Sequence, residues 1–177
     1  MMISNQYQIN FKGNLIKKGI VIPEKKFNEV AQIYKKQTKG LPDLTLSGKR
    51  ENDDWDGQFI HLTNAIINGE EFEVLSTGAL KRAFKEFSPK AVAKELVNIT
   101  KRYITKEKAS HLSAEIESLK YKIENIGIQL KHTKDAKYSN RLKVISERMN
   151  TTLTKKEEEY AKLKEDINKL TNEWCSE

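Results

Sequence analysis

The chain has 177 residues, of which 37% are hydrophobic, 32% are charged and one is cysteine. This length allows one medium domain or two small ones, and a composition this rich in charge is typical of a small core joined to long solvated helices. A single cysteine excludes an intrachain disulfide framework and a thiolate metal cluster. Because the sequence has no apolar run of about 18 residues and no signal-peptide pattern, we expect a cytoplasmic protein with no membrane partner.

The net charge of +7 is concentrated in the middle of the chain. Residues 1–77 carry ten basic and ten acidic side chains, residues 78–156 carry nineteen and eight, and residues 157–177 carry three and seven. A local excess of positive charge attracts polyanions such as nucleic acids. The basic middle segment is therefore the first candidate for a binding surface.

The N-terminal part shows short strand patterns around one helix. Residues 6–11 (QYQINF) alternate polar and apolar side chains, and residues 19–23 (GIVIP) are rich in β-branched residues. We therefore expect two strands joined by a turn at Gly13-Asn14. Residues 24–36 place apolar side chains at helical spacing, and Gly40 is expected to stop that helix.

Further strands are expected before residue 77. Residues 44–46 form one candidate, and residues 59–66 and 72–75 flank an Asn-Gly dipeptide, which is a strong signal for a β-hairpin. Residues 1–77 are thus predicted to form a small α+β domain.

Residues 52–63 (NDDWDGQFIHLT) have the spacing of an EF-hand calcium loop at five positions, but Thr63 stands where a bidentate Glu is needed. The end of this segment also has the pattern of a strand rather than a helix, so we predict no metal site here and no cofactor. An exposed tryptophan among aspartates suits a protein partner, whereas an inward-facing one would enlarge the small core. The candidate protein-binding residues are Asp53, Asp54, Trp55 and Asp56.

From residue 78 onward the pattern is helical. Residues 78–87 predict a short helix, and Ser88-Pro89 has the form of an N-terminal cap followed by proline at the first helical position. No proline follows residue 89, which allows very long helices. Residues 78–177 are therefore predicted to form a helical domain.

Two heptad seams predict a coiled coil. The second seam contains two consecutive four-residue steps at Met149 and Leu153, a stutter that locally unwinds a supercoil, and one polar member, Lys156. The first seam consists of Leu112, Ile116, Leu119, Ile123, Ile126 and Leu130, and the second consists of Leu142, Ile145, Met149, Leu153, Lys156, Tyr160, Leu163, Ile167, Leu170 and Trp174.

The break at residues 132–137 predicts that the two helices fold back on each other, with arms at about residues 89–131 and 138–174. In this register Leu130 lies near Leu142 and Leu112 lies near Tyr160. The short connection makes an intramolecular hairpin entropically favourable, and pairing of two chains through the same seams is the alternative. The predicted fold is α+β: a small N-terminal unit of β-hairpin and helix, followed by a long antiparallel helical hairpin.

No motif of a catalytic or nucleotide-binding site is present, and no two of the three histidines have metal-ligand spacing, so we do not expect an enzyme. Lys94, Lys101 and Lys108 recur every seven residues and so share one helix face, and further basic residues gather where the hairpin turns. The candidate nucleic-acid-binding residues are Lys81, Arg82, Lys85, Lys94, Lys101, Arg102, Lys106, Lys108, Lys134, Lys137, Arg141 and Lys143.

Residues 93–104 (AKELVNITKRYI) also resemble a helix-turn-helix, which would place a recognition helix among these basic residues. The leading prediction is a non-catalytic binding protein whose basic helical surface engages a nucleic acid or a nucleic-acid-bound enzyme. Such a protein would act as a regulator, a replication accessory or a phage or mobile-element inhibitor. The alternative is a protein-interaction or assembly factor that uses its coiled coil, including as a homodimer, and the acidic loop around Trp55. An enzyme with a scattered site comes third.

Overall fold

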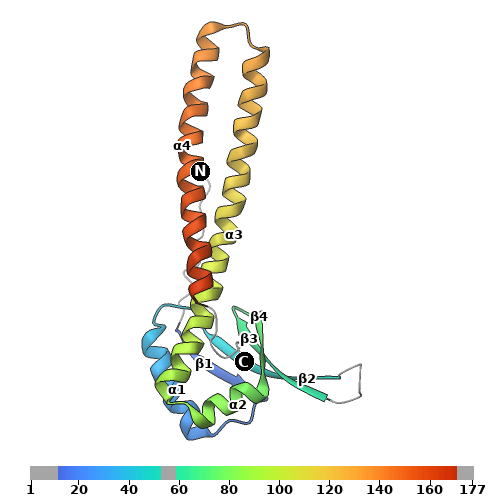
Figure 1. Cartoon of the computed structure of the whole chain (residues 1–177), viewed down its shortest axis with the longest axis vertical. Helices are drawn as coiled ribbons and strands as arrows, with labels where there is room; N and C mark the ends of the chain where they lie inside the picture. The colour runs from blue at the N-terminus through green and yellow to red at the C-terminus, as the bar shows by residue number, and fades with distance from the viewer. Residues whose placement is uncertain (1–11, 53–58, 171–177) are drawn as a thin grey trace, which may run out of the picture. The chain divides into compact units, whose positions relative to one another are not determined.

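A computed structural model describes residues 12–52 and 59–170 of the chain. The elements follow one another as β1 (Leu15–Lys18), α1 (Glu24–Gln37), β2 (Leu44–Asn52), β3 (Phe59–Ile67), β4 (Glu70–Ser76), α2 (Thr77–Glu86), α3 (Pro89–His132) and α4 (Ala136–Lys169) (Figure 1). They form the predicted α+β fold, a sheet with helices followed by a hairpin of two long helices. Residues 12–103 belong to one compact unit and residues 104–170 to a second, so α2 and the first part of α3 belong with the sheet.

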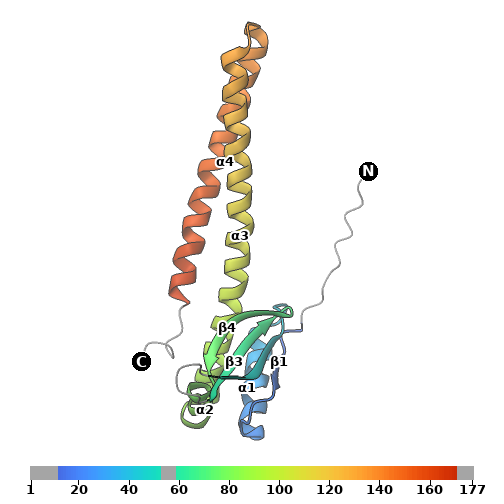
Figure 2. The ribbon, with the colours of Figure 1, turned by 90° about the vertical axis from the view of Figure 1, so that its right-hand side faces the viewer.

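The sheet of the first unit has four strands in the order β1-β2-β3-β4. β1 is parallel to β2, and the other neighbours are antiparallel. A parallel pair needs a crossover connection, which α1 supplies between β1 and β2 (Figure 2). On the core face, Leu44 and Leu46 of β2 stand opposite Ile67 and Ala65 of β3, and all four side chains are fully buried.

The first described strand differs from the prediction. Residues 19–23 are not a strand, and β1 instead occupies Leu15–Lys18, which the sequence had assigned to a turn. The alternating pattern of residues 19–23 has another cause: Ile20 and Ile22 are buried whereas Val21 is 82% exposed, although none of the described strands pairs with this segment. The predicted hairpin of residues 6–11 and 19–23 is therefore wrong at its second strand, and residues 6–11 lie outside the described part.

The other local predictions for the first unit are confirmed. α1 covers the predicted helix, and β2, β3 and β4 include the three predicted strands. β3 and β4 are joined by Asn68-Gly69, whose φ angles of 54° and 84° match the two left-handed positions of a type I′ turn. The strongly right-handed twist of that turn suits the two strands that it connects.

Helices supply most of the large side chains of the first core. α1 buries Phe27, Val30 and Tyr34, and Phe27 stacks on Phe84 of α2 with 6.2 Å between ring centroids. The first part of α3 buries one continuous face, because apolar side chains recur there every three or four residues. That face includes Val92, Leu96, Ile99 and Tyr103.

α3 begins where the sequence predicts. The backbone N–H of Ala91 donates to Ser88 Oγ at 3.3 Å, and Pro89 is the first helical residue. From there α3 continues without interruption for 44 residues, about 66 Å at ~1.5 Å per residue. The helix-turn-helix reading of residues 93–104 is therefore wrong, because no turn breaks the helix there.

The second unit is an antiparallel hairpin of the rest of α3 and α4, which lie side by side in both views (Figures 1 and 2). Residues 133–135 connect the helices, within the predicted break. Asp135 caps α4, since its carboxylate accepts hydrogen bonds from the backbone N–H groups of Lys137 and Tyr138. Within the described residues, no helix combines the length and the apolarity needed to cross a bilayer.

Polar contacts between the two helices agree with the predicted register. Each observed pair lies within about one and a half helical turns of the pairing expected from the seams. The pairs are Lys156 Nζ with Glu115 Oε2 at 2.5 Å, Lys120 Nζ with Glu157 Oε1 at 3.3 Å, and Tyr138 with Gln129 Oε1 at 3.1 Å. Lys156, the polar member of the predicted seam, thus has a carboxylate partner on the other helix.

The seam of α4 differs from the prediction at one position. Ile145 is 43% exposed, and the half-buried residue next to it is Ser146. With Ser146 in the seam, the steps from Leu142 to Met149 and Leu153 alternate between four and three residues, and the stutter disappears. Trp174, the last member of the predicted seam, lies outside the described residues.

Candidate nucleic-acid interface

The predicted basic residues are divided between the two compact units. One group lies in the first compact unit, on α2 and the first part of α3, and a second group lies in the hairpin. All but one of the residues are exposed. The first group consists of Lys81, Arg82, Lys85, Lys94, Lys101 and Arg102, and the second consists of Lys106, Lys108, Lys134, Lys137, Arg141 and Lys143.

The exception is Arg102, which is only 8% exposed. Its Nη2 atom donates to Glu73 Oε2 in β4 at 2.8 Å. A charge-assisted bond of this kind is about twice as strong as a neutral one, and breaking it to reach a phosphate would leave Glu73 without that partner. Arg102 therefore has a structural role that joins α3 to the sheet, and we leave it out of the candidate interface.

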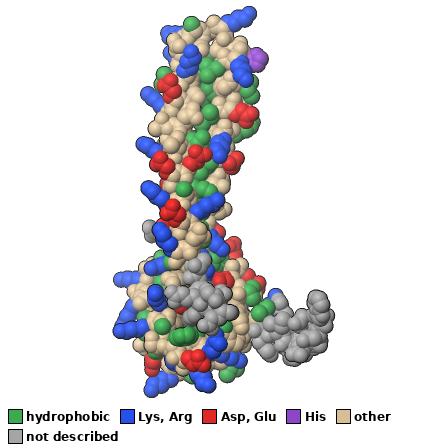
Figure 3. Space-filling model, in the orientation of Figure 1, with side chains coloured by type: hydrophobic (Ala, Val, Ile, Leu, Met, Phe, Trp, Pro, Cys, Tyr) green, Lys and Arg blue, Asp and Glu red, His purple; other side chains and the backbone are tan. Residues whose placement is uncertain are grey.

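The hairpin has two halves that differ in charge. We define the distal half as residues 121–148, which include the connection between the helices, and the proximal half as residues 104–120 and 149–170. The distal half carries seven Lys and Arg against three Asp and Glu, whereas the proximal half carries eight against eight. Figure 3 shows the basic side chains around the tip and the mixture of both signs farther down the hairpin.

The ion pairs of the hairpin are, like its charges, unevenly distributed. Among residues 104–170, the ion pairs lie in the proximal half, and two of them join the helices, Lys156 with Glu115 and Lys120 with Glu157. The ammonium group of Lys156 holds the pKa of the Glu115 carboxyl below its usual value through a hydrogen bond and charge attraction. The positive charge of the distal half is not balanced in this way.

The distal half also exposes apolar surface that the heptad analysis missed. Five large side chains there are between 43% and 67% exposed, whereas no large apolar side chain of the proximal half is exposed. Ile128 and Val144 could have been identified from the sequence, because both lie out of phase with the seam of their own helix. The five residues are Tyr121, Ile128, Tyr138, Val144 and Ile145.

Basic and apolar side chains meet on the outer surface of α4. A shallow hollow of about 490 Å³ is lined by Lys137, Asn140, Arg141, Val144 and Ile145. Lys137, Arg141, Val144 and Arg148 follow one another at three- or four-residue steps and so share a face about 16 Å long. Along one strand of duplex DNA, one phosphate occurs about every 3.4 Å, so this face has the length of several phosphates.

The remaining candidates from the sequence are the acidic loop around Trp55 and a metal site. Asp53, Asp54, Trp55 and Asp56 lie outside the described residues, and the segments on either side of them are strands, β2 and β3. Within residues 12–52 and 59–170, no three His, Cys, Asp or Glu side chains are grouped to hold a metal ion.

Comparisons of the chain with protein-family models, with curated proteins and with solved structures found no match. Function is therefore inferred from the residues and their geometry.

Proposed function

We propose that this protein is a non-catalytic binding protein whose helical hairpin engages a nucleic acid through its distal half. The observation that supports this is the separation of charge along the hairpin, with seven basic and three acidic residues in the distal half and eight of each in the proximal half. A surface that only kept the helices hydrated would need no such separation, because the balanced proximal half is hydrated equally well. The separation instead suits attraction of a polyanion to one end.

The proposed contact combines two kinds of interaction. Lys137, Arg141 and Arg148 would neutralise phosphates from one face of α4, and the release of counterions would make binding strongly dependent on salt. The exposed ring of Tyr138, at the same end of the hairpin, offers a surface on which a base can stack. Such contacts carry little sequence information, so we expect binding with weak base preference.

The test compares two variants of the same helix with equal loss of charge. In the distal variant Lys137, Arg141, Lys143 and Arg148 are changed to Gln, and in the control variant Lys155, Lys162, Lys164 and Lys169 are changed to Gln. All eight side chains are exposed on α4. Fluorescence anisotropy with labelled single-stranded and double-stranded oligonucleotides, over a range of salt concentrations, measures the affinity and its salt dependence.

We expect the distal variant to bind roughly tenfold or more weakly, and to reduce the slope of log K against log salt by up to about 3, because each lost phosphate contact removes about 0.7–0.9 from the slope. The control variant is expected to stay within about threefold of the unaltered protein. Equal losses in the two variants would show that only net charge matters. Unchanged binding in the distal variant would refute the proposed interface, and circular dichroism verifies that both variants remain folded.

A protein partner is the second candidate, and the exposed apolar residues favour it. Val144 and Ile145 lie beside basic side chains on α4, a combination that fits an acidic protein surface with an apolar centre or a second copy of the hairpin. Changing both to Ser would then abolish the interaction while leaving oligonucleotide binding nearly intact. Light scattering at high protein concentration tests self-association, and a strictly monomeric protein would exclude a homodimer.

A further inference from the structure

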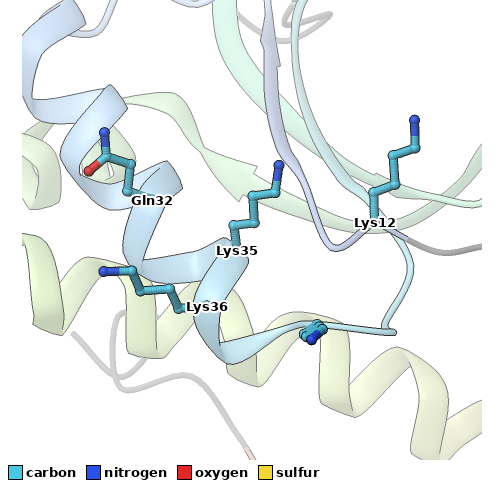
Figure 4. Close-up of a pocket in the computed structure, with 5 residues that line it drawn as sticks. Lys12, Gln32, Lys35 and Lys36 are labelled. Carbon is cyan, nitrogen blue, oxygen red and sulfur yellow. The ribbon is translucent and has the colours of Figure 1, made fainter.

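A second basic site lies in the first compact unit and includes none of the residues that the sequence analysis selected as binding candidates. An open pocket of about 700 Å³ is lined, among the described residues, by Lys12, Gln32, Lys35, Lys36 and Lys39 (Figure 4). Lys12 comes just before β1, and Lys39 just after α1. Figure 4 shows Lys12 and Lys35 extending in the same direction from their two segments.

Buried hydrogen bonds hold these segments together. Thr38 is fully buried, and its Oγ1 lies within hydrogen-bonding distance of Gly13 O at 3.0 Å and of Tyr34 O at 2.7 Å. Thr38, which precedes Lys39, therefore contacts Gly13, which follows Lys12. The lysine side chains are exposed, and this buried contact holds together the two chain segments that carry them.

The charge of the pocket is strongly positive. Four of its five described lining residues are lysines, and none of the five is acidic. The carboxylate closest in sequence to the four lysines, Asp43, accepts hydrogen bonds from Asn14 instead, at 2.7 Å from its backbone N–H and also from its side-chain amide. Lysine ammonium groups that line the same hollow repel one another, and an anion placed among them would relieve that repulsion.

The end of a helix explains only part of this cluster. Lys35 and Lys36 lie in the last turn of α1, where positive side chains interact favourably with the helix dipole. The dipole amounts to about half a negative charge at a helix C-terminus, which is far less than the charge of four lysines. The helix dipole also does not explain the presence of Lys12 in the pocket, because Lys12 belongs to a different segment of the chain.

We propose that this pocket binds a ligand that carries several phosphate groups. Its volume lies within the range of roughly 300–1,000 Å³ that is usual for small-molecule sites, so it would hold a small polyphosphate compound or the end of a nucleic-acid strand. The methylene stems of the lysines form its walls, and their ammonium groups reach the phosphates as mobile donors. This site is independent of the distal half of the hairpin.

Isothermal titration calorimetry with inorganic tripolyphosphate at low salt tests the site in the full chain. The pocket variant K12Q/K35Q/K36Q/K39Q is compared with the control variant K25Q/K90Q/K155Q/K162Q, which removes four exposed lysines elsewhere. We expect the pocket variant to bind tripolyphosphate roughly tenfold or more weakly and the control variant to bind within about twofold of the unaltered protein. The distal hairpin variant described above should bind it normally, which separates this site from the proposed function.

Competition identifies the source of the phosphate. If an oligonucleotide displaces tripolyphosphate from the unaltered protein and from the distal hairpin variant, the ligand is a nucleic-acid strand. If it does not, the ligand is a free polyphosphate compound. Absence of tripolyphosphate binding by the unaltered protein, or an equal loss in the pocket and control variants, would overturn the proposal. Thermal unfolding of each variant verifies that a loss of binding does not come from a loss of structure.

Discussion

The hydroxyl of Tyr34 in α1 lies 2.6 Å from Oγ1 of Thr100 in α3, and both side chains are fully buried. Thr100 Oγ1 also lies 3.4 Å from the carbonyl oxygen of Leu96, one turn earlier in α3. This pair joins the crossover helix of the sheet to the helix that continues into the hairpin. Burial raises the pKa of Tyr34 to about 12, because an ionised phenol would lose its hydration there.

The raised pKa of Tyr34 predicts a loss of stability at high pH. Its phenol ionises near 10.0 in an unfolded chain but only at about 12 in the folded protein, so its contribution is complete below pH 10 and is lost as the pH rises toward 12. A two-unit shift corresponds to roughly 2–3 kcal/mol. The advantage of the unaltered protein over Tyr34→Phe in free energy of unfolding should therefore shrink across this range. Parallel pH curves for the two proteins would contradict the burial of this phenol.

Arg102 and Glu73 predict a structural rather than a binding phenotype. Arg102→Met should reduce the free energy of unfolding by about 2–3 kcal/mol, because it removes a charged hydrogen bond from a mostly buried pair. Lys94→Met, an exposed change on the same helix, should stay within about 0.5 kcal/mol. Urea denaturation measures both values. If the Arg102 variant instead unfolds normally and binds oligonucleotides weakly, Arg102 belongs to the interface after all.

The phase of the α4 seam can be tested with matched truncations. Leu142 is 6% exposed and Ile145 is 43% exposed, so Leu142→Ala should cost about 2–4 kcal/mol and Ile145→Ala less than about 1 kcal/mol. Filling the half-buried position with Ser146→Ile should stabilise the hairpin by about 1 kcal/mol. Thermal unfolding followed at the helical circular dichroism band measures all three. If Ile145→Ala instead cost more stability than Leu142→Ala, the seam with Ile145 and a stutter would be the correct one.

Two glycines with left-handed backbones should respond differently to the same change. Gly13 has a φ of +61°, and a Cβ there would lie 2.2 Å from the carbonyl oxygen of Thr38, whereas Gly40 has a φ of +81° and open space around it. Gly40→Ala should cost about 1 kcal/mol from backbone strain alone. Gly13→Ala should cost clearly more, because the junction beside the lysine pocket must also move. Equal unfolding midpoints for the two variants would show that the junction is not tightly packed.

Local patterns were enough to predict much of this protein. The helix of residues 24–36, the Asn-Gly hairpin, the cap at Ser88 and the first heptad seam all follow from backbone geometry and side-chain periodicity within a short window. The long helical hairpin followed from the two seams and the short break between them. These features depend on residues that are close together in the chain, so the sequence determines them directly.

Contacts between distant residues decided the rest. β1 is a four-residue strand that is stabilised by its parallel pairing with β2. Its own sequence has a weaker strand pattern than the β-branched run at residues 19–23, so the sequence alone favoured the wrong segment. Arg102 has its partner 29 residues earlier in the chain, at Glu73. Ser146 takes the place expected for Ile145 because the opposite helix sets the phase of the seam. Lys12 and Lys35 line the same pocket because buried Thr38 contacts Gly13 and so holds their two segments together. No sequence pattern within a short window predicts that contact.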